Sequence, residues 1–404
     1  MILTATAQIR PTNTLWRITV KTFVQTLTVA VLVLSVAPAG FGGGSQEGAT
    51  PGAAAARTSR AQVELLGAGA SFPAPLITAW ADEYRDLTGG AVTINYQSIG
   101  SGGGVRQFME QTIMFGATEA ALNDDNAELA RRNSGGLAYN MPITLGDVVL
   151  TYNVPGVDQG LVFSPDTVAG AFLGEITRWN DRRIAELNPG VNLPNLPIQI
   201  AHRSDGSGTT NIFTNYLTKV NRTWADRIGF GSSVNWPVGS GGNGNEGVAG
   251  IVQSTPGALG YNSLVYAVLN DITYGNVINN SGNVVAPSLQ ATSLAAAVDI
   301  PTDGRIMLTD TDAPNGYPIA GFAWALVYEN LDRNQAISTR EQAEELTRFL
   351  YWVVTEGQDI NESLDFARLP ADAQALAESM IATLKWQGHP VGERVIADVR
   401  AMGF

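Results

Sequence analysis

Cysteine is absent from this 404-residue sequence, and the only histidines are His202 and His389. Without cysteine the chain has no disulfides, no thiolate metal sites and no lipidated N-terminal cysteine. No cluster of other candidate metal ligands stands out in the sequence. We therefore expect neither a metal nor another cofactor, and no residue is assigned a catalytic role.

Basic residues are scarce: 24 lysines and arginines stand against 37 aspartates and glutamates, a formal charge of −13. An acidic chain is a poor partner for nucleic acid. It also cannot attract an anion through a long-range field. A binding site for an anion would have to rely on local dipoles and a few well-placed donors.

The N-terminal region has no apolar run long enough to span a membrane, which takes about 20 residues. It carries Arg10, Arg17 and Lys21, a short apolar run over 29–36, and the A-x-A sequence Ala37-Pro38-Ala39. This pattern is typical of a secretory signal peptide over 1–39. We expect an exported, soluble, periplasmic protein without a lipid anchor; an uncleaved membrane anchor is the alternative.

Residues 40–60 are rich in glycine and alanine and have no apolar periodicity, so we expect a disordered linker.

Folded sequence is expected from about Val63. Three strand–turn–helix units follow, with strands near 63–67, 92–99 and 198–200, and with the second helix beginning at Val105 after a glycine turn. Such units indicate an α/β fold. Ser338-x-x-Glu341 is predicted to be a capping box.

Three loops share one design, in which a hydroxyl stands beside glycine at the start of a predicted helix. They are GAGASFPAP at 67–75, IGSGGG at 99–104 and RSDGSGTT at 203–210. Free backbone N–H groups and the helix dipole favour anions at such positions, and glycine permits close approach. The candidate donors are Ser71, Ser101, Ser207 and Thr209; for each alone, a simple N-cap is the alternative interpretation.

The third loop also carries the only positive charge of the three. Arg203 can bind an oxyanion through its planar guanidinium, and Asp205, two residues later, can hold that group in orientation. A surface ion pair is the alternative interpretation. Together the three loops predict a clamp for a small tetrahedral oxyanion.

GAGASFPAP, YQSIGSGGG, FGATEAAL and RSDGSGTT occur in this order, and with them the chain over about 65–404 resembles the periplasmic phosphate-binding proteins of bacterial phosphate ABC transporters. The resemblance implies a type II periplasmic-binding-protein fold, with two α/β lobes joined by a two-crossing hinge and the ligand in the cleft. Lobe one would comprise 61–143 with 319–404, and lobe two 144–318, with crossings near Thr144 and Pro318.

By the same resemblance, the protein would bind inorganic phosphate with high affinity and deliver it to the permease subunits of an ABC importer. It would act as a monomer and touch the membrane only transiently, through the permease. The implied phosphate-binding residues are Ser71, Phe72, Ser101, Glu119, Arg203, Ser207, Gly208 and Thr209, and Asp205 matches the residue that orients the arginine.

Glu119 departs from the family pattern, which has aspartate at this position. A carboxylate here can accept the proton that phosphate keeps near neutral pH, whereas sulfate has none to offer. We therefore expect preference for phosphate over sulfate to persist. The longer side chain leaves affinity and discrimination between phosphate and arsenate open.

Two other motifs are weaker indications of function. The G-x-G-x-x-G matches within 239–247 lack an obvious preceding strand and do not predict nucleotide binding. Ser207 lacks the glycine two residues earlier that a hydrolase nucleophile elbow requires. An exported phosphatase or esterase using Ser207, and a phosphate scavenger without a transporter, remain the alternatives.

Overall fold

The computed structural model describes residues 62–402. They belong to one compact unit that extends from Ala61 to Phe404. The signal peptide expected over 1–39 and the linker expected over 40–60 lie outside the described residues. Within the described part, no helix combines the length and apolar character that crossing a bilayer would need.

One eight-stranded mixed sheet forms the framework, in the order β2-β1-β3-β11-β4-β8-β6-β7. Its strands are β1 (Val63–Gly69), β2 (Val92–Ser98), β3 (Phe115–Thr118), β4 (Ala138–Tyr152), β6 (Gln199–Arg203), β7 (Ser240–Gly242), β8 (Ala258–Ser263) and β11 (Ala320–Tyr328). The strands β1, β2 and β3 are parallel to one another, as are β6, β7 and β8. The mixed sheet with helices between its strands confirms the predicted α/β class.

The strand β4 belongs to both halves of this sheet. It pairs with β11 from Ala138 to Asp147 and with β8 from Val148 to Tyr152, antiparallel in both cases. The changeover therefore falls between Asp147 and Val148. Every residue of β11, and nearly all of β4, is buried, because both strands lie at the centre of the sheet.

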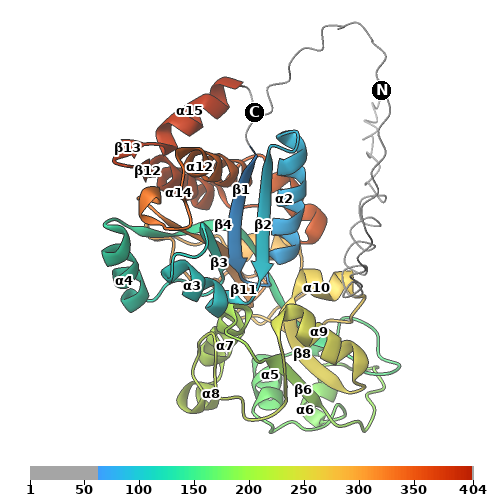
Figure 1. Cartoon of the computed structure of the whole chain (residues 1–404). Helices are drawn as coiled ribbons and strands as arrows, with labels where there is room; N and C mark the ends of the chain where they lie inside the picture. The colour runs from blue at the N-terminus through green and yellow to red at the C-terminus, as the bar shows by residue number, and fades with distance from the viewer. Residues whose placement is uncertain (1–61, 403–404) are drawn as a thin grey trace, which may run out of the picture. The chain divides into compact units, whose positions relative to one another are not determined.

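Helices flank the two half-sheets (Figure 1). Those in or beside the β1–β3 half are α2 (Ala74–Leu87), α3 (Ser101–Met109), α4 (Asp124–Ser134), α12 (Arg340–Val354), α13 (Gln358–Asn361), α14 (Ala371–Ala382) and α15 (Gly392–Met402). Those of the chain between β4 and β11 are α5 (Pro165–Phe172), α6 (Arg182–Ala185), α7 (Gly208–Val220), α8 (Arg222–Arg227), α9 (Gly244–Ser254), α10 (Leu264–Leu269) and α11 (Leu289–Ala295).

Small elements complete the described chain. They are the strands β5 (Val162–Phe163), β9 (Asn276–Ile278), β10 (Val284–Val285), β12 (Lys385–Trp386) and β13 (His389–Pro390), and the 3₁₀ turns η1 (Leu331–Arg333) and η2 (Glu362–Leu364). β5, β9 and β10 form a three-stranded sheet of their own, and β12 pairs with β13.

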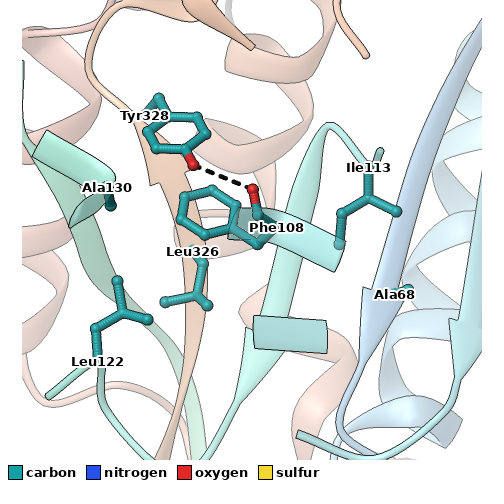
Figure 2. Close-up of a cluster of buried hydrophobic side chains, with 7 residues drawn as sticks. All are labelled: Ala68, Phe108, Ile113, Leu122, Ala130, Leu326 and Tyr328. Carbon is teal, nitrogen blue, oxygen red and sulfur yellow. Dashed lines mark hydrogen bonds between the residues drawn. The ribbon is translucent and has the colours of Figure 1, made fainter. Parts of the chain in front are cut away.

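A buried cluster fixes the position of α3 (Figure 2). The ring of Phe108, near the end of α3, stacks on Tyr328 of β11 with centroids 4.3 Å apart. The hydroxyl of Tyr328 donates a hydrogen bond of 3.1 Å to the carbonyl of Phe108. Full burial of a large apolar side chain such as that of Phe108 contributes roughly 1.5–3 kcal/mol to the free energy of folding. The cluster therefore anchors the C-terminal part of α3, the end away from Ser101.

Two local predictions were wrong. The helix α3 begins at Ser101 rather than Val105, so three glycines lie in its first turns, where the backbone needs close approach: a Cβ on Gly104 would lie 2.5 Å from the Cα of Gly69. The capping box of α12 uses Thr339 and Gln342, one residue later than predicted, because Ser338 lies outside the helix and donates to the Gln342 side chain.

Candidate functional site

The loops singled out in the sequence come together where the two half-sheets meet. The side chains expected to contact the ligand are buried, and Arg203 is the most exposed of them at 3%, whereas the side chain of Asp205 is partly exposed. Gly208 N–H donates to Ser101 Oγ over 3.0 Å, and the main-chain N–H of Gly102 donates to the carbonyl of Gly206 over 2.8 Å. Residues more than one hundred positions apart in the chain thus form one continuous polar cluster.

Glycine at 208 makes this contact possible. A Cβ at this position would lie 2.4 Å from Glu119 Oε2 and 2.7 Å from Ser101 Oγ, well inside van der Waals contact. Gly100 has a φ of +79°, and a Cβ there would lie 2.2 Å from Asp205 Oδ2. The backbones of the two halves therefore meet with no room for a side chain between them.

Four helices, α2, α3, α7 and α9, begin at the cluster. Ser207 is the N-cap of α7, where its Oγ accepts a hydrogen bond of 3.0 Å from the N–H of Thr210. The N-termini of α2 and α3 have no side-chain cap hydrogen bond. Helix N-termini present partial positive charge and N–H donors. The N-terminus of α9 likewise has no side-chain cap hydrogen bond, so the cluster combines one capped and three uncapped helix ends.

Arg203 ends β6 and is held in a fixed orientation. Its Nε and Nη2 donate to the two carboxylate oxygens of Asp205 over 2.7 and 2.6 Å. Burial alone would raise the pKa of Asp205, but the hydrogen bonds and charge of Arg203 lower it below the ordinary value. Gly244 N–H also donates to this carboxylate, over 3.1 Å. Arg203 Nη1, 3.4 Å from Thr209 Oγ1, faces the cluster.

Glu119 follows β3 and is 1% exposed. Burial raises the pKa of its carboxyl to about 8, despite the opposing effects of the Arg203 charge and the Ser101 hydrogen bond. Ser101 Oγ lies 3.4 Å from Oε2, while the buried Oε1 has no hydrogen-bond partner among the described residues. An unpaired buried carboxyl oxygen is costly unless another group satisfies it.

Phe72 contributes differently from the hydroxyl residues. Its ring is fully buried and meets Phe366 edge-to-face, with centroids 5.6 Å apart. The side chain therefore belongs to the hydrophobic core. A ligand contact from Phe72 would have to come from its main chain.

Asn245, at the start of α9, is a member of the cluster that sequence reasoning missed. It is fully buried, and its Nδ2 donates to both Ser71 Oγ and Thr209 Oγ1, each over 3.0 Å. The signal was present, because Asn245 stands beside glycine at a helix start, as the hydroxyls do. Asn245 carries an amide in place of a hydroxyl.

The strand before α9 was also missed. β7 is only three residues long, Ser-Gly-Gly, yet it pairs in parallel with β6. A strand without side-chain alternation leaves no pattern in the sequence. Gly242 lies against Gly247, where a Cβ on Gly242 would be 2.5 Å from the carbonyl carbon of Gly247. The glycines of this motif thus permit close packing of strand and helix.

Neither histidine points to hydrolysis at Ser207. The ring of His202 stacks on Trp236 at 4.9 Å, and its Nδ1 lies 3.0 Å from the carbonyl oxygen of Arg203. His389 is exposed in β13. Across the described part of the chain, no group of three or more His, Cys, Asp or Glu residues is placed to hold a metal ion.

Comparison with known proteins identifies the family. A model described as the PBP superfamily domain matches residues 49–356. The phosphate-binding protein PstS of Xylella fastidiosa is 39% identical over 313 residues, covering 76% of this chain and 82% of that protein. That of Pasteurella multocida is 37% identical, covering 78% and 89%.

The fold is shared with solved structures as well. A high-affinity periplasmic phosphate-binding protein, PfluDING, superposes with a TM-score of 0.65 at 19% identity, covering 82% of this chain and 98% of that one. This likeness confirms the predicted two-lobed type II architecture. The match to the superfamily model and the extent of identity to the PstS proteins show that this chain belongs to the phosphate-binding protein family of the PBP superfamily.

Proposed function

We propose that this protein binds inorganic phosphate at the cluster around Arg203 and Glu119 and delivers it to the permease of an ABC importer. The observation that carries the proposal is a buried set of donors gathered around one carboxyl group with an unpaired oxygen. Burying an anion is favourable only where nearly all of its oxygens are paired. The relatives, named as phosphate-binding proteins, support the same ligand.

The proposed ligand contacts are those expected from the sequence. Phosphate would be bound by Ser71, Ser101, Ser207 and Thr209 through hydroxyls, by Arg203 through its guanidinium and by Glu119 through its carboxyl. Phe72 and Gly208 would contribute through their main chains, and the N–H of Gly208 would exchange its bond to Ser101 Oγ for one to the ligand. Asp205 would orient Arg203, as the two hydrogen bonds between them support.

Glu119 would share a proton with the ligand. With a pKa of about 8, its carboxyl holds a proton at neutral pH before a ligand enters. The carboxyl and bound phosphate together then need only one proton between them, whichever partner brings it. Sulfate brings none and depends on the proton of Glu119. Preference for phosphate over sulfate should therefore grow as the pH rises.

We further propose lobe one as 61–143 with 319–404 and lobe two as 144–318. The changeover of β4 at Asp147/Val148, and the start of β11 at Ala320 beside it, support crossings in this region. Closure of the lobes would bury the ligand, and the closed form is what a permease would recognise. The proposed setting is the periplasm, with the mature chain beginning near Gly40 as a soluble monomer.

We propose binding without catalysis. Ser207 Oγ accepts the N-cap hydrogen bond of α7, and within the described residues no histidine or carboxylate is hydrogen-bonded to it to act as a base. The relatives carry the names of binding proteins. Incubation with a chromogenic phosphate ester tests this directly. Metal-independent hydrolysis that disappears in Ser207→Ala would favour the enzyme instead.

Calorimetric titration with phosphate tests the proposed site. Arg203→Ala should weaken binding by about 2–5 kcal/mol, roughly 30-fold or more, because the anion and Asp205 lose their charged partner. Arg222→Ala is the matched control, since Arg222 is 88% exposed and pairs only with a surface aspartate on its own helix. Equal affinity in Arg203→Ala and wild type would place the site elsewhere.

A further inference from the structure

The side-chain amide of Asn245 has a fixed orientation. Its Oδ1 accepts a hydrogen bond of 2.9 Å from the N–H of Ser263, which identifies the other end as the NH₂ group. The main-chain carbonyl of Asn245 accepts a bond of 2.7 Å from Asn262 Nδ2. Both partners lie at the end of β8. The NH₂ group of Asn245 therefore points into the cluster as an obligate donor.

That donor meets two hydroxyls, one from each half of the molecule. Ser71 Oγ accepts two hydrogen bonds from Asn245, one from its main-chain N–H and one from Nδ2, each 3.0 Å long. Thr209 Oγ1 accepts from Asn245 Nδ2 over 3.0 Å and from Arg203 Nη1 over 3.4 Å. A hydroxyl has two lone pairs and one proton. On both residues the lone pairs are engaged, and only the O–H remains to be used.

We propose that Asn245 is a positioning residue that makes Ser71 and Thr209 donate to the bound anion. The inference rests on the proposed function, in which phosphate lies within this cluster. An oxyanion offers almost only acceptors, and a hydroxyl that turned its lone pairs toward it would repel it. By filling those lone pairs with N–H groups, Asn245 removes the repulsive arrangement before the ligand arrives.

The position of Asn245 adds a second consequence. Ser71 follows β1, whereas Thr209 and Asn245 belong to the chain between β4 and β11. The amide of Asn245 therefore orients Ser71 only while the two halves are in contact. The side chain of Asn245 would therefore both orient the donors and link the two sides of the cluster.

Replacement by aspartate is the most direct test. In Asn245→Asp the carboxylate accepts protons from the hydroxyls instead of donating to them, and phosphate affinity should fall about 100-fold or more. Asn243→Asp is the control: it adds the same charge two residues away, at the exposed N-cap of α9. Affinity should change there by no more than about threefold. Equal losses in the two variants would assign the effect to charge and overturn the proposal.

A second test needs no added charge. Asn245→Ala should weaken phosphate binding about tenfold in wild type, and clearly less in a Ser71→Ala/Thr209→Val background, because the amide acts through those hydroxyls. Equilibrium dialysis with labelled phosphate measures all four proteins, including weak binders. The same loss in both backgrounds would mean a merely structural role and would overturn the proposal. Failure of wild type itself to bind phosphate would instead refute the proposed function.

Discussion

The two sides of the cluster contribute different chemistry. The loops after β1, β2 and β3 supply hydroxyls and the carboxyl of Glu119, and the helices α2 and α3 begin there without side-chain caps. The other side supplies the cation Arg203, the hydroxyls of Ser207 and Thr209, and the starts of two helices, α7, which Ser207 caps, and α9, which has no side-chain cap. The cation Arg203 and the carboxyl of Glu119 thus lie on opposite sides. Neither side alone can satisfy a protonated oxyanion, so recognition depends on bringing them together.

Of the substitutions considered below, Gly208→Ala should disturb the close contact between the two sides of the cluster most. The added methyl group would lie 2.4 Å from Glu119 Oε2 and force the two sides apart. We expect phosphate affinity to fall about 10- to 100-fold, from an overpacking cost of roughly 1–3 kcal/mol. Gly250→Ala, on α9, is the control. Apart from its chain neighbours and its own helix backbone, an added Cβ there would have no heavy atom within 4 Å. Calorimetry on both variants checks the expectation, and unaltered binding in Gly208→Ala would show that close approach is not required.

The protonation of Glu119 should make the ratio of phosphate to sulfate affinity depend on pH. Sulfate needs the proton of Glu119, which is lost as the pH rises through about 8. The ratio of phosphate to sulfate affinity should therefore increase about tenfold per pH unit above this pKa. Glu119→Gln cannot lose a proton, so its ratio should stay flat and sulfate should be admitted. Competition titrations from pH 6 to 9 measure both.

The length of the Glu119 side chain is tested separately. Glu119→Asp introduces the aspartate that the family resemblance implies at this position. It should change the phosphate-to-arsenate ratio while the ratio of phosphate to sulfate affinity still rises with pH, because only the reach of the carboxyl differs. Three unchanged affinities in Glu119→Gln would mean that Glu119 does not contact the ligand.

Asp147 lies at the boundary between the two halves and should affect stability. Burial raises the pKa of its carboxyl to about 8, and neither carboxyl oxygen has a hydrogen-bond partner among the described residues. The folded protein then holds a proton that the unfolded chain has released. Stability is greatest below the ordinary pKa and falls, on the order of 1.4 kcal/mol per pH unit, as the pH rises toward 8.

Asp147→Asn should flatten this pH dependence. Thermal unfolding between pH 5 and 9 measures it, in a Glu119→Gln background because Glu119 titrates in the same direction. Asp82→Asn, at a side chain 56% exposed, serves as the control. A slope equal to that of the parent protein would contradict the prediction.

Loss of the serine hydroxyls at the starts of α7 and α3 gives the smallest expected effect on stability. Ser207→Ala removes the N-cap of α7 and should cost about 1 kcal/mol of stability in addition to phosphate affinity. Ser101 caps no helix through its side chain, so Ser101→Ala should lower affinity with a smaller loss of stability. Melting temperatures and titrations of both variants separate the two roles. Equal destabilisation would remove this difference between the halves.

Local sequence patterns predicted much of the fold and the candidate site. Glycine beside a hydroxyl predicted the loops of Ser71, Ser101 and Ser207, and the spacing of Arg203 and Asp205 predicted their ion pair, which the structure contains. These signals work because helix starts and short-range pairs depend on neighbouring residues. The ligand roles themselves stay predictions.

Features that depend on distant partners could not be predicted. The role of the Asn245 amide depends on its hydrogen bond to Ser71, which is far away in the chain. The three-residue strand β7 exists because β6 lies beside it. Gly104 was interpreted as part of a turn, yet its requirement for glycine comes from the backbone of Gly69. In each case the deciding contact is tertiary.

The place of β11 in the sheet has a consequence for how an exported chain would fold. It lies between β3 and β4, although the whole segment from β5 to α11 separates it from them in sequence. A chain that emerges N-terminus first can assemble β4 with β6, β7 and β8 while β11 is still absent. The strands β1, β2 and β3 can pair with one another, but β3 lacks its antiparallel neighbour until β11 arrives, and closing so long a loop is slow. Addition of β11 would therefore be the step that joins the Glu119 side of the cluster to the rest of the sheet.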